Sequence, residues 1–285
     1  MAWLTAYDGW SFYVHQGVIM FADADPVWWG RRQDANGAVR TVWMGNDRVI
    51  GYADNYVQST ERHPMQDLAQ RLRDFGVKGR VGVEMDNYYF TASALLSLQA
   101  HLPQASFKDA TGLVNWQRAV KSETEITYMR RAARIVERMH EVIREKAEVG
   151  MRKNDLIADI YHASVSGAEG HWGDYPACVP MTPSGLDATA PHTTWDDAPL
   201  RNNEGTFFEI AGCYQRYHVP LSRTIFLGKP PQHILDAESA VLEGMDAGLE
   251  VARPGNTCHD IADAFLKSLE KRGIIKDNRC GYSIG

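Results

Sequence analysis

The sequence predicts an α/β amino-terminal domain over residues 1–118, followed by an α+β domain over residues 119–285. Short strand-like runs alternate with helical runs in the first part, which is typical of an α/β domain. In the second part, strand-like runs lie between two pairs of amphipathic helices, and the change occurs near Val120. A length of 285 residues also suits two domains, since a domain typically has about 150 residues.

The amino-terminal elements are marked by apolar runs between turn residues. Gly45-Asn46-Asp47 predicts a hairpin turn between two strands. Apolar residues at helical spacing, Leu68, Leu72 and Phe75, predict a helix that ends at Gly76. We expect strands at 17–22, 26–30, 41–44, 48–53 and 80–85, and helices at 65–76 and 90–103.

A capping box marks the first helix of the second domain, with Ser122 at the N-cap and Glu125 three residues later. Apolar residues then recur every three or four positions towards Gly150. We expect a second helix from Asn154, a strand pair within 207–228, and helices over 232–252 and, capped by Thr257, over 258–272.

The charge balance argues against a nucleic-acid partner, because 36 Asp and Glu exceed 30 Lys and Arg and give a net charge of −6. Four widely spaced cysteines, Cys178, Cys213, Cys258 and Cys280, predict the reduced thiols of a cytoplasmic protein. Every apolar run is shorter than the roughly 20 residues of a membrane helix. We therefore expect a cytoplasmic protein that binds neither nucleic acid nor a membrane.

Both ends of the sequence interrupt a pattern. An apolar pattern begins almost at residue 1, and CGYSIG (280–285) is typical of the start of a strand. We therefore expect a fragment, with the first domain incomplete at its start and the second at its end.

Three stretches of the second domain resemble signatures of the pita-bread metallopeptidase superfamily, which includes aminopeptidase P, prolidase, methionine aminopeptidase and creatinase. They are residues 183–192, the strand pair at 207–228, and residues 280–285. Ser184 and His192 keep the spacing of eight found in that superfamily, with Asp187 where asparagine is usual. The resemblance implies a pita-bread catalytic domain behind a creatinase-type amino-terminal domain.

The same resemblance locates the positions of the superfamily's metal ligands. Two aspartates eleven residues apart correspond to Glu209 and Pro220, and a ligand histidine corresponds to Tyr282. A divalent ion needs carboxylate or imidazole ligands, and proline has no side-chain ligand. The resemblance therefore implies neither a metal ion nor another cofactor at this site.

Runs along the whole chain resemble the bacterial ectoine hydrolases, a creatinase-like branch of the superfamily. The runs include YDGWSFYVHQ (7–16), GRRQDANGA (30–38), HTTWDD (192–197) and GTFFEIAG (205–212). This resemblance implies a metal-independent hydrolase that opens the cyclic amidine ring of ectoine to an N-acetylated 2,4-diaminobutyrate. Ser222 counts against creatine as the substrate, because a creatinase has glutamate there. The alternatives are a creatinase-like amidinohydrolase, an Xaa-Pro peptidase with an aberrant metal site, and a catalytically inert binding domain.

Two residues are expected to carry the chemistry. His192 can act as a base and then as an acid near neutral pH. Glu209 is a carboxylate on an apolar strand, where it can pair with a cationic ring or attack the ring carbon. The structural alternative for Glu209 is an ion pair with Arg216 or Arg223, and His218 is expected at an exposed strand end without a specific partner.

The expected partner is a small zwitterionic substrate, bound by a homodimer in which the amino-terminal domain completes the neighbour's site. Aromatic side chains would contact the delocalised cation, and a guanidinium would bind the carboxylate. Asp174, in Gly-Asp-Tyr-Pro, would position a loop. The expected substrate-binding residues are Trp10, Phe12, Tyr13, Arg31, Asp174 and Tyr282.

Overall fold

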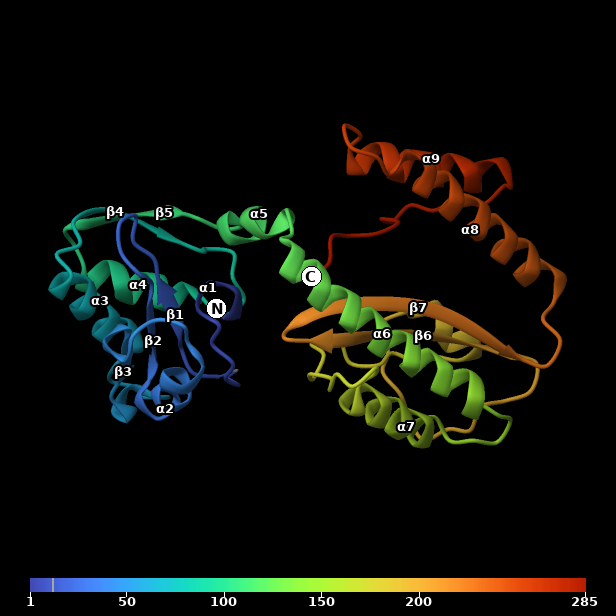
Figure 1. Cartoon of the computed structure of the whole chain (residues 1–285), viewed down its shortest axis with the longest axis horizontal. Coiled ribbons are helices and arrows are strands. Elements are labelled where there is room, and N and C mark those ends of the chain that lie inside the picture. The colour runs from blue at the N-terminus through green and yellow to red at the C-terminus, as the bar shows by residue number, and fades with distance from the viewer. Residues whose placement is uncertain (12) are drawn as a thin grey trace. The chain divides into compact units, whose positions relative to one another are not determined.

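The computed structural model describes residues 1–11 and 13–285 (Figure 1). The described chain forms two compact units, Met1–Val120 and Lys121–Gly285. Each unit has an apolar core of its own, so each has the basic requirement of a folding domain.

The first sheet of the amino-terminal unit has the strand order β1 (Gly17–Ile19), β2 (Val27–Arg31), β3 (Val49–Tyr52). The first two strands pair antiparallel, whereas β3 runs parallel to β2. Parallel neighbours need a crossover connection, and α2 (Arg32–Thr41) provides it. The predicted hairpin between 41–44 and 48–53 is therefore wrong.

The rest of this unit follows the predicted alternation. Strands β4 (Gly79–Val83) and β5 (Ala105–Asp109) form a parallel pair, and the predicted helices at 65–76 and 90–103 are confirmed to within a few residues. These two helices are α3 (Pro64–Asp74) and α4 (Ala92–His101). The unit also contains the helices α1 (Ala2–Thr5) and α5 (Leu113–Ala119).

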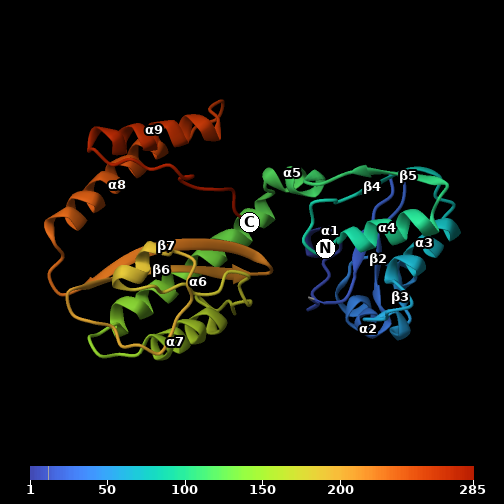
Figure 2. The ribbon, with the colours of Figure 1, turned by 180° about the vertical axis from the view of Figure 1, so that it is seen from behind.

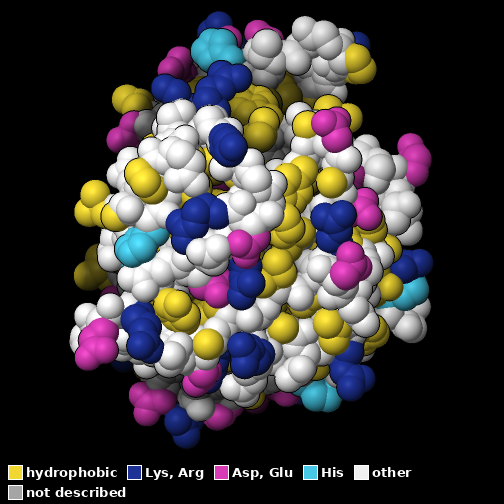
Figure 3. Space-filling model, turned by 90° about the vertical axis from the view of Figure 1, so that its left-hand side faces the viewer, with side chains coloured by type: hydrophobic (Ala, Val, Ile, Leu, Met, Phe, Trp, Pro, Cys, Tyr) yellow, Lys and Arg dark blue, Asp and Glu magenta, His cyan; other side chains and the backbone are white. Residues whose placement is uncertain are grey.

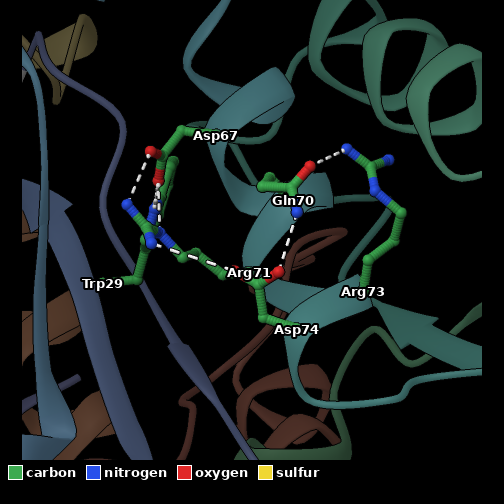
Figure 4. Close-up of polar contacts among 6 residues, drawn as sticks. All are labelled: Trp29, Asp67, Gln70, Arg71, Arg73 and Asp74. Carbon is green, nitrogen blue, oxygen red and sulfur yellow. Dashed lines mark hydrogen bonds and ion pairs between the residues drawn. The ribbon is translucent and has the colours of Figure 1, made fainter.

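The core of the amino-terminal unit includes one polar anchor, shown in Figure 4. Trp29 on β2 is 1% exposed, and its indole Nε1 donates a hydrogen bond of 2.9 Å to the Asp67 carboxylate on α3. Arg71, one turn further along α3, donates to the same carboxylate. A buried indole N–H needs a partner, so this contact fixes α3 against the sheet.

The carboxy-terminal unit begins with α6 (Glu123–Lys146), whose predicted capping box is present. The backbone N–H of Glu125 donates to Ser122 Oγ, and the Ser122 N–H donates to the Glu125 carboxylate. The predicted helices that follow are confirmed as α7 (Lys153–Ser166), α8 (Gln232–Val251) and α9 (Cys258–Lys271).

A long hairpin is the centre of this unit, and its two strands are β6 (Glu204–Tyr214) and β7 (Tyr217–Leu227). Its two-residue turn, Gln215-Arg216, has positive φ at both residues (51° and 67°), as a type I′ turn requires. Figures 1 and 2 show α6 lying along one face of this hairpin.

The contact between α6 and the hairpin is close at Gly212. A Cβ atom at this position would overlap the Ala132 carbonyl oxygen on α6 and crowd the Val136 backbone nitrogen. Glycine therefore sets the short distance between helix and strand. The strand expected at 280–285 is wrong, because these residues have no regular secondary structure and Gly285 lies beside Lys121 and Met129 of the α6 region.

Candidate active site

The two faces of the β6–β7 hairpin differ in chemistry. Side chains alternate between the faces of a strand, and Phe208 and Ile210 (1% and 0% exposed) pack into the core formed with α6 and α7. Glu209 lies between them and projects to the other face, where it is half-buried. Its cross-strand neighbour Ser222 is exposed. The carboxylate is thus on the open face of the sheet.

A third stretch of chain runs along the free edge of β6, and we call residues 174–184 the flanking segment. Glu209 exchanges two backbone hydrogen bonds with Met181 in this segment, of 3.0 and 3.1 Å. Next along the ladder, Phe207 N–H donates to the Pro183 carbonyl, and Ser184 Oγ lies 2.9 Å from Thr206 Oγ1. The backbone of Glu209 is therefore hydrogen-bonded to the flanking segment, while Phe208 and Ile210 on either side of it pair with β7.

The structure contradicts both ion pairs considered for Glu209. Arg223 is opposite Phe208 in the ladder, so it projects to the α6 face, away from Glu209. Arg216 lies in the turn, about 20 Å along the strand at roughly 3.3 Å per residue, and its guanidinium binds Asp174 at 3.1 Å. The carboxylate of Glu209 is available for another role.

The donor set around Glu209 does not fit a metal ion. Pro220 pairs with Ala211, which puts its ring on the same face as Glu209 and diagonally across from it. A proline side chain carries no donor atom. Within residues 1–11 and 13–285, no three side chains from His, Cys, Asp and Glu converge as a metal site.

Two residues that were not expected at the site, Cys178 and Tyr161, lie within electrostatic range of its groups. Burial raises the pKa of the Cys178 thiol, and the Glu209 carboxylate raises it further. Burial and the neighbouring Cys178 raise the pKa of the Tyr161 phenol on α7. Tyr161 also packs edge-on against Trp195 at 6.0 Å between ring centroids. Their proximity depends on tertiary structure alone, so no local sequence signal could reveal it.

His192 lies in an exposed turn after a short 3₁₀ helix, Gly185–Thr189. Among the described residues, no hydrogen bond joins its ring to Glu209. The run that ends at His192 starts at Ser184, on the edge of β6 and opposite Thr206. The structure thus places the start of this motif on the edge of β6, three residues along the strand from Glu209, while its histidine is at the surface.

Asp174 has the contacts of a loop anchor. Its side chain is 8% exposed, and its carboxylate accepts hydrogen bonds from the backbone N–H and the guanidinium of Arg216, each 3.1 Å long. Its own N–H donates to the Cys213 carbonyl. These contacts tie the flanking segment to the hairpin turn.

The expectation for His218 is wrong, because the residue is half-buried and has specific partners. Its Nε2 accepts a 2.9 Å hydrogen bond from the Ala177 N–H, and its Nδ1 lies 2.9 Å from the Arg216 carbonyl oxygen. Ala177 is 41 residues earlier in the chain. A partner so distant in sequence gives no local signal.

Three of the residues expected to bind substrate from the amino-terminal unit, Trp10, Tyr13 and Arg31, lie at its surface or pair within it. Trp10 and Tyr13 are 62% and 49% exposed. Arg31 donates to the Tyr13 hydroxyl and to Asp54, and the bond to Asp54 raises the pKa of the Arg31 guanidinium. Phe12 lies outside the described residues.

Tyr13 also lines a pocket of about 210 Å³ within the amino-terminal unit. The rings of His15 and His63 lie there with their centroids 4.9 Å apart and their planes tilted by 46°, and burial lowers the pKa of both imidazoles. Tyr282, the remaining expected residue, is 57% exposed in the carboxy-terminal unit, with the Arg279 guanidinium 5.3 Å from its ring centre.

The surface shows no basic stripe on the face drawn in Figure 3, where Lys and Arg are interspersed with Asp and Glu. Within the described residues, every helix is too short or too polar to cross a membrane.

Two sequence profiles account for nearly the whole chain. The profile described as "Creatinase/Prolidase N-terminal domain" matches residues 1–120, and that of "Metallopeptidase family M24" matches residues 127–285. The chain belongs to metallopeptidase family M24. The expected creatinase-type domain followed by a catalytic domain of this family is thus confirmed, and the M24 chain is a hydrolase.

Curated relatives of this M24 chain include the ectoine hydrolase of Halomonas elongata, 56% identical over all of the chain and 73% of the relative. A hydrolase/peptidase of Sinorhizobium fredii, named as uncharacterized, is 45% identical over 99% of the chain and 73% of the relative.

Solved structures support the pita-bread fold. The Xaa-Pro dipeptidase of Bacillus anthracis superposes with a TM-score of 0.80 at 17% identity, over 100% of this M24 chain and 74% of the other. The prolidase of Thermococcus sibiricus has a TM-score of 0.80 at 16% identity, over 95% of this chain and 70% of the prolidase.

Proposed function

We propose that this M24 chain hydrolyses a ring C–N bond of ectoine without a metal ion and releases an N-acetylated 2,4-diaminobutyrate. The observation that supports the substrate is the 56% identity with an ectoine hydrolase over the whole chain. The reaction adds one water to the amidinium carbon and breaks one ring C–N bond, and the leaving nitrogen takes a proton.

Glu209 supports a metal-free reaction on a cation. Its carboxylate is on the open face and lacks the arginine partners that were considered for it. A half-buried carboxylate gains from an opposite charge, and the amidinium of ectoine supplies one. With Pro220 in the second ligand position, water activation by a pair of metal ions has no donor set here.

In this proposal Glu209 binds and orients the amidinium, and His192 transfers the proton to the leaving nitrogen. A covalent role for Glu209 can be tested directly. Mass spectrometry of the intact protein quenched during turnover would show an adduct on a peptide containing Glu209 if the carboxylate attacks the ring carbon. An unmodified mass throughout turnover would support the electrostatic role.

The proposal includes a cytoplasmic homodimer whose amino-terminal units complete the neighbouring sites. The exposed rings of Trp10 and Tyr13 suit contact with a cation, and four free cysteines suit a reducing compartment. Co-expression of Trp10→Ala and Glu209→Gln subunits tests the exchange, with each variant alone as the control. Activity in the mixed dimer above that of both controls supports a shared site, and its absence contradicts one.

One assay tests the function as a whole. The protein is incubated with ectoine, with creatine and with an Xaa-Pro dipeptide, each with and without EDTA. We expect turnover of ectoine alone, unchanged by EDTA. Dipeptide cleavage that EDTA abolishes would indicate a peptidase, creatine cleavage would indicate an amidinohydrolase, and no turnover would favour a binding domain.

His192 is tested by substitution with alanine. We expect turnover to fall about 10²- to 10⁴-fold, the usual contribution of a general acid or base, while ectoine still binds in calorimetry. A near-normal rate in His192→Ala would remove this histidine from the mechanism.

A further inference from the structure

We propose that His218, as its neutral Nδ1–H tautomer, is a positioning residue that holds the flanking segment against β6 and so shapes the site around Glu209. This inference rests on the proposed function for its effect on catalysis, although its structural part can be measured without a substrate.

Two contacts define the tautomer of His218. The Ala177 backbone nitrogen can only donate, so the imidazole Nε2 that lies 2.9 Å from it must be the acceptor and carry no proton. Nδ1 then carries the proton and donates to the Arg216 carbonyl oxygen, also at 2.9 Å. Both ring nitrogens are satisfied only in this neutral form.

Protonation of His218 would open this connection. A proton on Nε2 would point at the Ala177 N–H, so two donors would face each other and the hydrogen bond would be lost. A second anchor, the Asp174–Arg216 ion pair, would remain three residues away. The segment would then be held at Asp174 and at Met181 but not between them.

The groups that face His218 come from each element around it. Cys213 on β6 places its Sγ 3.7 Å from Nδ1, and burial and Asp174 raise the pKa of this thiol to about 12, so it stays neutral. Asp174 and Arg216 carry opposite charges and bind each other. Tyr175, in the flanking segment, stacks on the Arg216 guanidinium at 4.4 Å. Asp174 and Arg216, the charged groups in these contacts of the described residues, thus form a compensated pair.

The connection to Glu209 passes through the residues that follow Ala177. Cys178 comes next, and the charge of the Glu209 carboxylate raises the pKa of its thiol. Met181, three residues further, exchanges both backbone hydrogen bonds with Glu209. A loosened segment would therefore leave the carboxylate with one fixed backbone neighbour, β7, and with more water around it.

A pair of substitutions separates the two ring nitrogens. Glutamine places its amide oxygen near the position of Nε2 and can accept from Ala177, but it cannot titrate. Asparagine is shorter and can reach the Arg216 carbonyl only. His162→Gln, at an exposed position on α7, is the matched control.

Amide hydrogen exchange without substrate tests the structural part. We expect His218→Asn to speed exchange at Ala177 and Met181 about tenfold, the usual effect of losing one buried hydrogen bond, while His218→Gln and His162→Gln stay near wild type. As the pH falls, Ala177 should lose protection relative to α6 amides in the wild type but not in His218→Gln. Equal exchange rates in the wild type and the three variants would overturn the proposal, provided that thermal unfolding shows each protein to be folded.

Kinetics test the consequence for catalysis. We expect kcat for ectoine to fall about tenfold in His218→Asn and to recover in His218→Gln. The acid limb of the profile of kcat against pH should differ between His218→Gln and the wild type. If exchange changes but kcat does not, the segment is held by His218 and does not shape catalysis, which overturns the proposal. If the wild type turns over no ectoine while the exchange pattern is as expected, the proposed function fails and the positioning contact stands.

Discussion

The two faces of the β6–β7 hairpin are built from alternate residues of the same strands, yet one face is buried and the other is not. On the α6 face, Phe208 and Ile210 are buried, and Gly212 lets the helix approach. On the other face, Glu209, Pro220 and Ser222 are half-buried or exposed. The first face supplies stability, and the second presents the carboxylate to which the proposed function assigns the substrate.

This difference teaches how a carboxylate can be held rigidly without an arginine partner. The backbone of Glu209 itself is hydrogen-bonded to Met181, and its neighbours on the strand, Phe208 and Ile210, pair with β7 and are anchored in the core. Of the two arginines considered as partners, neither Arg216 nor Arg223 pairs with the side chain. Rigidity therefore comes from the backbone, and in the proposed function the charge of Glu209 pairs with the cationic substrate.

The sharpest test of the open face is Glu209→Gln. Removing a charge that stabilises the reacting cation should lower kcat about 10²- to 10³-fold, while the free energy of unfolding changes by about 0.5 kcal/mol or less. Steady-state kinetics and urea unfolding measure the two effects, with Ser222→Ala on the same face as the control. A Glu209→Gln protein with normal turnover would mean that the open face holds no catalytic carboxylate.

The opposite outcome is expected on the closed face for Phe208→Ala. Truncating a fully buried phenylalanine should cost about 3–5 kcal/mol of unfolding free energy, because it leaves a cavity against α6 and α7. Urea unfolding checks this, and Thr224→Ala, exposed on the open face, serves as the control at about 0.5 kcal/mol or less. Equal losses for both variants would remove the distinction between the faces.

Gly212→Ala tests how closely α6 and β6 are packed. The added methyl group would overlap the Ala132 carbonyl, so helix and strand must separate, at a cost of about 1–3 kcal/mol. Thermal unfolding gives the change in stability. A variant as stable as the wild type would show that the helix can shift freely.

The smallest effect expected is the pH dependence contributed by His140, on α6. Burial lowers the pKa of its imidazole, and Arg223 and Arg144 lower it further. The unfolded chain then binds more protons than the folded one just below the ordinary value of 6.5. The contribution of His140 to the free energy of unfolding is fully present above about pH 6.5, and it is lost as the pH drops towards the lowered pKa. His140→Gln should flatten this slope in urea unfolding, and an unchanged slope would contradict the assignment.

The sequence allowed much of this structure to be predicted, because many signals are local. The capping box at Ser122 and Glu125, the apolar period of α6 and the position of Glu209 on a strand all depend on nearby residues. The parallel pairing of β3 was missed, since a Gly-Asn-Asp turn resembles a hairpin while its partner strand lies some 20 residues earlier. His218 and Cys178 were missed for the same reason, as their partners are distant in the chain.

Pro220 has a consequence for the outer edge of β7. Because Glu209 directs its own N–H and carbonyl to Met181, the Glu209–Ser222 and Ala211–Pro220 pairs are non-hydrogen-bonded ones, and the Pro220 nitrogen points away from β6. The hairpin therefore loses no hydrogen bond to proline. Any strand that added to this edge would find one donor missing beside the site, so proline interrupts the edge as a template for self-association.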